Sequence, residues 1–143
     1  MEQRLSVVTL GVRDITKSRQ FYEAGLGWRR TAGEDDVAFY QAGGFVVALY
    51  AWDKLAEDAH VAPSGVGFRG ISLGFCTHSK QKVDDILSAA KAAGGAVIVN
   101  SRDTFWGGYA GYFTDLDGHL WEIAWNPGWT LTDKGETLLE KPS

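Results

Sequence analysis

The sequence has few of the residues that would place it in several broad classes of protein. It has one cysteine, Cys76, which excludes an internal disulfide and any metal site made only of cysteines. No apolar run has the length of a membrane-spanning helix, and the residues after Met1 are too polar for a signal peptide. Lysine and arginine number 14 against 18 aspartates and glutamates, which argues against nucleic acid and membrane partners. We therefore expect a cytoplasmic protein.

What the sequence does contain favours a folded α+β protein. Its 143 residues suit one domain, or one domain built from two small modules. Hydrophobic residues make up 45%, which is enough for a core. Glycine is frequent at 18 residues, and such an excess favours strands, bulges and tight turns.

The first half predicts a strand, a helix and three further strands. Residues 5–12 are rich in β-branched side chains and predict a strand. Asp14 stands at an N-cap position for a helix over 15–24, which Gly25 or Gly27 would end. The other predicted elements are strands at 28–31, 37–41 and 45–50 and one helical turn at 53–58.

The same order of elements returns in the second half. The sequence predicts strands at 70–76 and 96–100, a helix at 80–93 capped by Ser79, a loop at 101–108 and a hairpin at 109–125. Residues 9–12 match residues 72–75, so we interpret the chain as an internal duplication. The predicted segments are a first βαβββ module at 1–58, a linker at 59–69, a second module at 70–127 and a tail at 128–143, within one structural domain.

The hairpin near the end of the second half carries the residue of greatest interest. Asp117-Gly118 is a strong signal for a tight turn, and 119–125 reads as a strand. Glu122 then lies on the face opposite the apolar Trp121, Ile123 and Trp125. This carboxylate has three open interpretations: a hydrogen-bonded group with no chemical task, a general acid or base, or the partner of a cationic ligand.

Two stretches of the chain resemble a known superfamily. They are VTLGVRDITKSRQFYEAGLGW at 8–28 and YFTDLDGHLWEIAWNP at 112–127. Both resemble the vicinal oxygen chelate superfamily of glyoxalases, bleomycin-resistance proteins and extradiol dioxygenases. The resemblance implies paired βαβββ modules whose curved sheets enclose a cleft. It also implies a homodimer and, in the enzymes, a divalent metal held by one residue from each of four strands.

Matched onto this chain, the metal positions implied by the resemblance are mostly unsuitable. They fall at Val7, Ala48, Gly70 or Ile71, and Glu122. Only Glu122 has a donor atom, and one carboxylate cannot hold an ion that wants about six ligands. His119 and Glu122 would point to opposite faces of their strand, and surface positions are expected for His60 and His78. We therefore predict no metal and no cofactor.

Aromatic side chains form the second predicted feature of the site. Tyr50, Trp52, Trp106 and Tyr109 are candidates for binding a flat or apolar small molecule, although each could instead belong to the core. Trp106 precedes Gly107-Gly108 and is expected to be accessible. Two functions follow: binding of a small organic molecule in a metal-free aromatic cleft, or an enzyme, a lyase, isomerase or dioxygenase, in which Glu122 acts as metal ligand or general acid or base.

Overall fold

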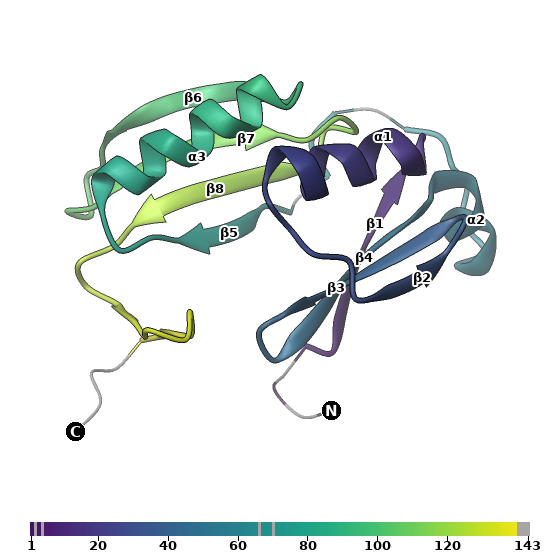
Figure 1. The fold of residues 1–143 in the computed structure, drawn as a ribbon, viewed down its shortest axis with the longest axis horizontal. Coiled ribbons are helices and arrows are strands. Elements are labelled where there is room, and N and C mark those ends of the chain that lie inside the picture. Colours follow the sequence, from purple (N-terminus) through teal and green to yellow (C-terminus); the bar gives the residue numbers. More distant parts are fainter. Residues whose placement is uncertain (2, 4, 66, 70, 140–143) are drawn as a thin grey trace. The chain divides into compact units, whose positions relative to one another are not determined.

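The computed structural model describes residues 1, 3, 5–65, 67–69 and 71–139 (Figure 1). Contacts within the chain divide it into two units, Met1–Arg69 and Gly70–Ser143. Each unit has the predicted βαβββ order and a four-stranded sheet, so the prediction of tandem modules is confirmed. The segment boundaries predicted at 58 and 127 stay predictions. Among the described residues, no helix combines the length and apolarity needed to cross a bilayer.

The sheet of the first unit has the strand order β1-β4-β3-β2. Its strands are β1 (Val7–Val12), β2 (Ala32–Glu34), β3 (Val37–Ala42) and β4 (Phe45–Ala51). Strands β1 and β4 run parallel, whereas the β3–β4 hairpin turns through Gly43-Gly44. Its helical elements are α1 (Ile15–Gln20), the π-helical turn η1 (Phe21–Gly25) and α2 (Trp52–Asp58).

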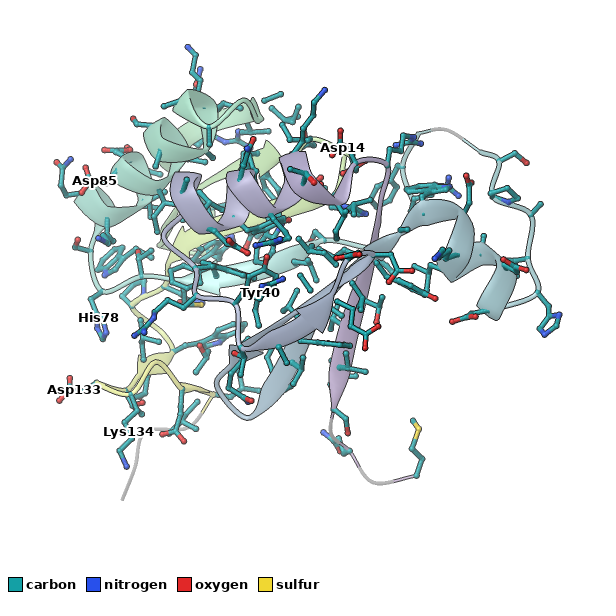
Figure 2. All side chains as sticks on the ribbon, turned by 45° about the vertical axis from the view of Figure 1, so that its right-hand side comes forward. Asp14, Tyr40, His78, Asp85, Asp133 and Lys134 are labelled. Atoms are coloured by element: carbon teal, nitrogen blue, oxygen red, sulfur yellow. The ribbon has the colours of Figure 1, made fainter. Side chains whose placement is uncertain are left out.

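An aromatic cluster packs between α1, η1 and the sheet in the core of the first unit. Phe21 and Tyr22 are buried at the end of the first helix, and Tyr22 packs against Trp28 with ring centroids 5.0 Å apart. Trp28 in turn contacts the ring of Tyr40, which lies on β3 beneath α1 (Figure 2). The Tyr40 hydroxyl donates to Glu23, so the one polar atom of this buried ring is satisfied.

The prediction of a strand at 28–31 is wrong, because the strand that follows the first helix is β2 (Ala32–Glu34). Gly27 has a φ of 78°, which ends the helix in the left-handed conformation as predicted. The Trp28 amide still bonds to the Tyr22 carbonyl, so Trp28 is held at the helix end. The chain joins the sheet only where the Thr31 amide bonds to the Phe39 carbonyl.

The sheet of the second unit repeats the pattern with the order β5-β8-β7-β6. Its strands are β5 (Leu73–Cys76), β6 (Ala96–Asp103), β7 (Tyr109–Thr114) and β8 (Leu120–Trp125). Helix α3 (Lys80–Ala92) begins at Ser79, whose hydroxyl accepts from the Lys82 amide, and it packs on β6, β7 and β8. The tail forms a small hairpin of β9 (Thr130–Leu131) and β10 (Thr137–Leu138), which the sequence analysis did not predict.

Two boundaries in this unit differ from the predictions. Strand β6 continues to Asp103, so the predicted loop shrinks to the residues between Asp103 and Tyr109. Its pairing with β7 shifts register between Val97 and Val99 and again between Val99 and Arg102. These irregularities lengthen β6 relative to β7. Strand β5 begins at Leu73, and the predicted first residue of that strand, Gly70, lies outside the described residues.

Close packing of α3 on its sheet depends on Gly111 in β7. A Cβ atom at this position would lie 2.5 Å from Leu87 Cδ1 and 2.8 Å from the Val99 carbonyl oxygen. The first atom belongs to the helix and the second to the irregular part of β6. Any side chain at position 111 would therefore push both elements away.

We expect Gly111→Ala to lower the free energy of unfolding by about 1–3 kcal/mol, the usual cost of overpacking a core. Urea denaturation would measure the change. The matched control is Gly74→Ala, because a Cβ on Gly74 meets no atom within 4 Å. Equal stability of the wild type and Gly111→Ala would contradict the packing described above.

Candidate functional site

Glu122 lies in the middle of β8, on the face of the second sheet opposite α3. Its cross-strand neighbours are Tyr112 on β7 and Gly74 on β5. The Tyr112 hydroxyl donates a hydrogen bond to Glu122 Oε2, and both side chains are partly buried. Among the described residues, this hydroxyl is the one hydrogen-bond partner of the Glu122 side chain.

The carboxylate also stabilises the protonated form of Tyr112. The hydrogen bond to Glu122 raises the pKa of the Tyr112 hydroxyl, and burial and the negative charge of Glu122 act in the same direction. The positive charge of Arg102 acts in the opposite direction. Tyr112 therefore stays protonated at neutral pH and remains a donor toward Glu122.

Tyr112 is not predicted as a site residue from the sequence, because the sequence does not reveal the register of the hairpin. A two-residue turn at Asp117-Gly118 would have placed Phe113 opposite Glu122. The structure instead has a three-residue loop, Leu116 to Gly118, with the Asp115 amide bonded to the His119 carbonyl. This extra loop residue pairs Tyr112 with Glu122.

The first unit has the same three positions with different side chains. Ala48 on β4 corresponds to Glu122, and its neighbours are Phe39 on β3 and Thr9 on β1. The carboxylate and the phenol hydroxyl of the second unit are thus both replaced by apolar groups. The polar pair is confined to the second unit.

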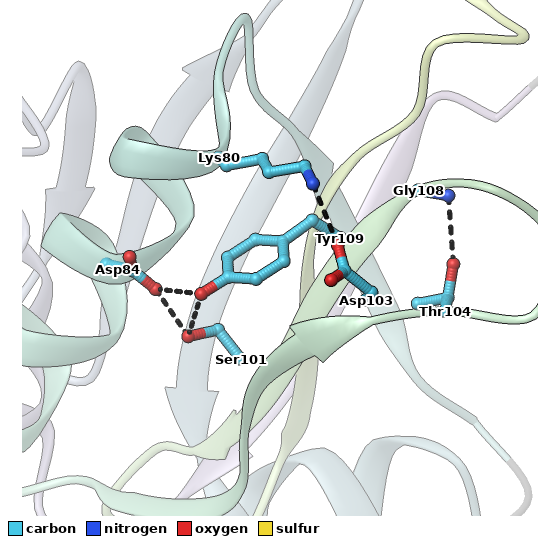
Figure 3. A network of polar contacts seen from close by, with 7 residues as sticks. All are labelled: Lys80, Asp84, Ser101, Asp103, Thr104, Gly108 and Tyr109. Atoms are coloured by element: carbon cyan, nitrogen blue, oxygen red, sulfur yellow. Dashed lines mark hydrogen bonds and ion pairs between the residues drawn. The ribbon is translucent and has the colours of Figure 1, made fainter.

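Tyr109 lies on the other face of the second sheet from Glu122. It pairs with Trp125 on β8, and its hydroxyl lies 2.9 Å from Asp84 Oδ1 and 3.1 Å from Ser101 Oγ (Figure 3). Lys80 lies over its ring at 5.5 Å from the centroid and bonds to Asp103. This network ties α3 to β6 and β7, so the structure does not bring Tyr109 and Glu122 together.

Trp106 lies in the tight loop between β6 and β7. The Thr104 amide bonds to the Gly108 carbonyl, and the Thr104 hydroxyl accepts from the Gly108 amide (Figure 3). The ring of Trp106 lies against Gly108, where any Cβ would collide with it. Trp106 is 39% exposed and Phe105 is fully exposed, so this loop presents aromatic surface.

The other two predicted aromatic residues belong to the first unit. The Trp52 indole donates to the Pro63 carbonyl at 2.7 Å, and the Arg13 guanidinium lies over its ring at 4.2 Å. Trp52 also covers Gly11, so its ring is engaged in packing α2 on the sheet. Burial and the nearby Asp58 raise the pKa of Tyr50, which follows Ala48 on the same face of β4.

The positions that the resemblance assigns to a metal do not fit one. Thr9 pairs with Ala48 in the first unit, and Gly74 pairs with Glu122 in the second. Because Ala48 corresponds to Glu122, Thr9 corresponds to Gly74 and Val7 corresponds to Ser72. This counterpart of Val7 lies two residues later in the chain than the alignment from the sequence placed it. Ile71 is therefore not the equivalent position, and Gly70 lies outside the described residues. The side chains of Val7 and Ala48 have no atom that can bind a metal. The four positions therefore offer only the Ser72 hydroxyl and the Glu122 carboxylate.

A second group of potential ligands lies at the β7–β8 turn. Asp115, Asp117 and His119 have donor atoms within 4.8 Å of one another. The Asp115 carboxylate already accepts from the backbone amides of Asp117 and His119, and its other oxygen lies 2.7 Å from His119 Nδ1. These contacts explain the group as the hydrogen bonding of a turn.

Comparison with known proteins identifies the family of this chain. The family model of the glyoxalase/bleomycin resistance protein/dioxygenase superfamily matches residues 4–123. A glyoxalase-related enzyme from Fulvimarina pelagi is 35% identical, with a TM-score of 0.87 over 95% of this chain and 97% of that chain. No curated protein matches this chain.

Two more distant structures share the fold. A glyoxalase/bleomycin resistance protein/dioxygenase family enzyme from Burkholderia phytofirmans is 22% identical, with a TM-score of 0.74 over 83% of this chain and 95% of that one. A lactoylglutathione lyase from Agrobacterium tumefaciens is 18% identical, with a TM-score of 0.67 over 88% and 96%. From the family model and the similarity to the Fulvimarina pelagi enzyme, this chain belongs to the glyoxalase/bleomycin resistance protein/dioxygenase superfamily.

Proposed function

We propose that the protein binds a small organic molecule, without a metal, at the face of the second sheet that carries Glu122. The observation that supports this most directly is the Tyr112–Glu122 pair on the face opposite α3. One oxygen of the carboxylate accepts from Tyr112, and the other has no partner among the described residues. A partly buried carboxylate with an available oxygen suits a ligand that donates a hydrogen bond or carries positive charge.

The second candidate function is an enzyme of the same superfamily. The Fulvimarina pelagi structure is named as a glyoxalase-related enzyme, which favours this alternative. In that case Glu122 would take a proton from the bound substrate, and Tyr112 would hold the carboxylate in place. Turnover that is lost in Glu122→Gln while ligand binding persists would distinguish the enzyme from a binding protein.

We also propose that the protein is a cytoplasmic homodimer. The edge strand β5 has Phe75 exposed on its α3-side face, and Ile71 just before it is exposed as well. The tail adds Trp129 and Leu139, both exposed. Apolar side chains of this size favour association between copies.

Protein purified without chelator is expected to contain less than about a tenth of an equivalent of Mn, Fe, Co, Ni or Zn, because Val7 and Ala48 offer no ligand atom. Elemental analysis would measure this. Added metal should leave the melting temperature unchanged, since a ligand stabilises only by its affinity for the folded state. Stoichiometric metal would contradict the prediction. Its loss in Glu122→Gln or in His119→Asn would show which group holds it.

Glu122→Gln is expected to keep the fold and to weaken or change ligand binding, because the side-chain shape is preserved and the charge is removed. Trp106→Ala should also weaken binding, through lost stacking, with little loss of stability. A small-molecule thermal-shift screen of the wild type and both variants would measure this. If Glu122→Gln unfolds while hits bind Trp106→Ala unchanged, Glu122 is structural and the proposed site is wrong.

Light scattering at micromolar concentration is expected to give twice the chain mass of 15.6 kDa. Replacing exposed apolar residues should favour the monomer, and Phe75→Ser with Ile71→Ser is the first variant to measure. Phe105→Ser, at an exposed residue away from β5, is the matched control. A wild-type mass near that of one chain would refute the dimer.

A further inference from the structure

The proposed function leaves open which chemical group meets Glu122 and from which side. We propose, resting on that function, that Glu122 accepts a single N–H donor from the Gly74 side and that Tyr112 makes the site prefer an ammonium to an amidinium or guanidinium. Tyr112 is then a specificity-determining residue and Gly74 is the position that admits the ligand.

Space next to Glu122 is available on the Gly74 side. Gly74 is the cross-strand neighbour of Glu122 in a parallel pair, so a side chain at position 74 would point to the same face. A Cβ built there meets no atom within 4 Å, and Gly74 is exposed on the edge strand β5. A ligand group can therefore reach the carboxylate over Gly74.

Tyr112 occupies the other side of the carboxylate. Its hydroxyl donates to Glu122 Oε2, which weakens that oxygen as an acceptor for a second donor, and leaves Oε1 without a partner among the described residues. An amidinium or guanidinium binds a carboxylate best through two parallel N–H bonds, one to each oxygen. An ammonium is a compact charge that binds well to one oxygen. The Tyr112 hydrogen bond thus penalises the two-pronged cation and leaves the ammonium almost unaffected.

The charges on this face favour the same direction of approach. Arg102 on β6 pairs with Ala110, which shares its face of β7 with Tyr112. The Arg102 charge acts on the Tyr112 hydroxyl, in agreement with that placement. Strand β5, in contrast, reads Leu-Gly-Phe-Cys and carries no formal charge. A cation is therefore repelled from the β6 side of the pair and not from the β5 side.

Benzylamine and benzamidine test the preference, because they share a ring and differ in the cation. Calorimetry or ligand-observed NMR should show tighter binding of benzylamine to the wild type. Tyr112→Phe frees the second oxygen, so it should shift the affinity ratio toward benzamidine by about tenfold, the worth of one charge-assisted hydrogen bond. A residue with a merely structural role would lower both affinities and leave their ratio unchanged.

Substitutions at Gly74 test the direction of approach. Gly74→Ala and Gly74→Val should reduce benzylamine binding progressively while leaving stability equal or higher, because a strand interior favours both residues over glycine. Phe75→Val is the matched control, since it changes the opposite face of the same strand. It should leave benzylamine binding intact.

The outcomes separate this inference from the function on which it rests. If Glu122→Gln abolishes benzylamine binding, but Tyr112→Phe leaves the ratio unchanged or Gly74→Val binds normally, this inference is wrong and the proposed function stands. If neither amine binds, or if both bind Glu122→Gln as well as the wild type, the proposed site fails together with the inference.

Discussion

The hydrogen bonding of the Asp115 carboxylate is the constraint on which the Glu122 face depends. This buried group holds the β7–β8 turn through the amides of Asp117 and His119 and through the His119 ring. The resulting loop sets the register of the hairpin, and the register decides which residue of β7 faces Glu122. A shift by one residue would bring Phe113 out from under α3 and remove the hydroxyl from the carboxylate.

Most of the fold could be predicted because its signals are local. Caps at Asp14 and Ser79, the glycine turns and the alternation of apolar residues indicate both modules. Errors arose where long-range packing decides the outcome. Trp28 is held by Tyr22 and Tyr40 instead of joining a strand, and β6 extends through two register shifts that no short pattern reveals.

The site was less predictable, because its members come from different strands. Glu122 could be recognised as a carboxylate on the less apolar face of one strand. Its partners Tyr112 and Gly74 could not, since pairing across strands depends on loop length and on a parallel crossover. The position of Tyr109 beside a glycine-rich loop predicts a binding residue, yet its hydroxyl bonds to Asp84 on α3.

The duplicated architecture provides an internal comparison of these positions. Where the second unit has Tyr112 and Glu122, the first has Phe39 and Ala48 on strands of the same order and direction. The same arrangement of strands therefore occurs twice in one molecule, with the polar pair in the second unit and an apolar pair in the first. The backbone plan itself does not require a carboxylate or a phenol at these positions, because the first unit forms the same four-stranded sheet with Phe39 and Ala48 in their place.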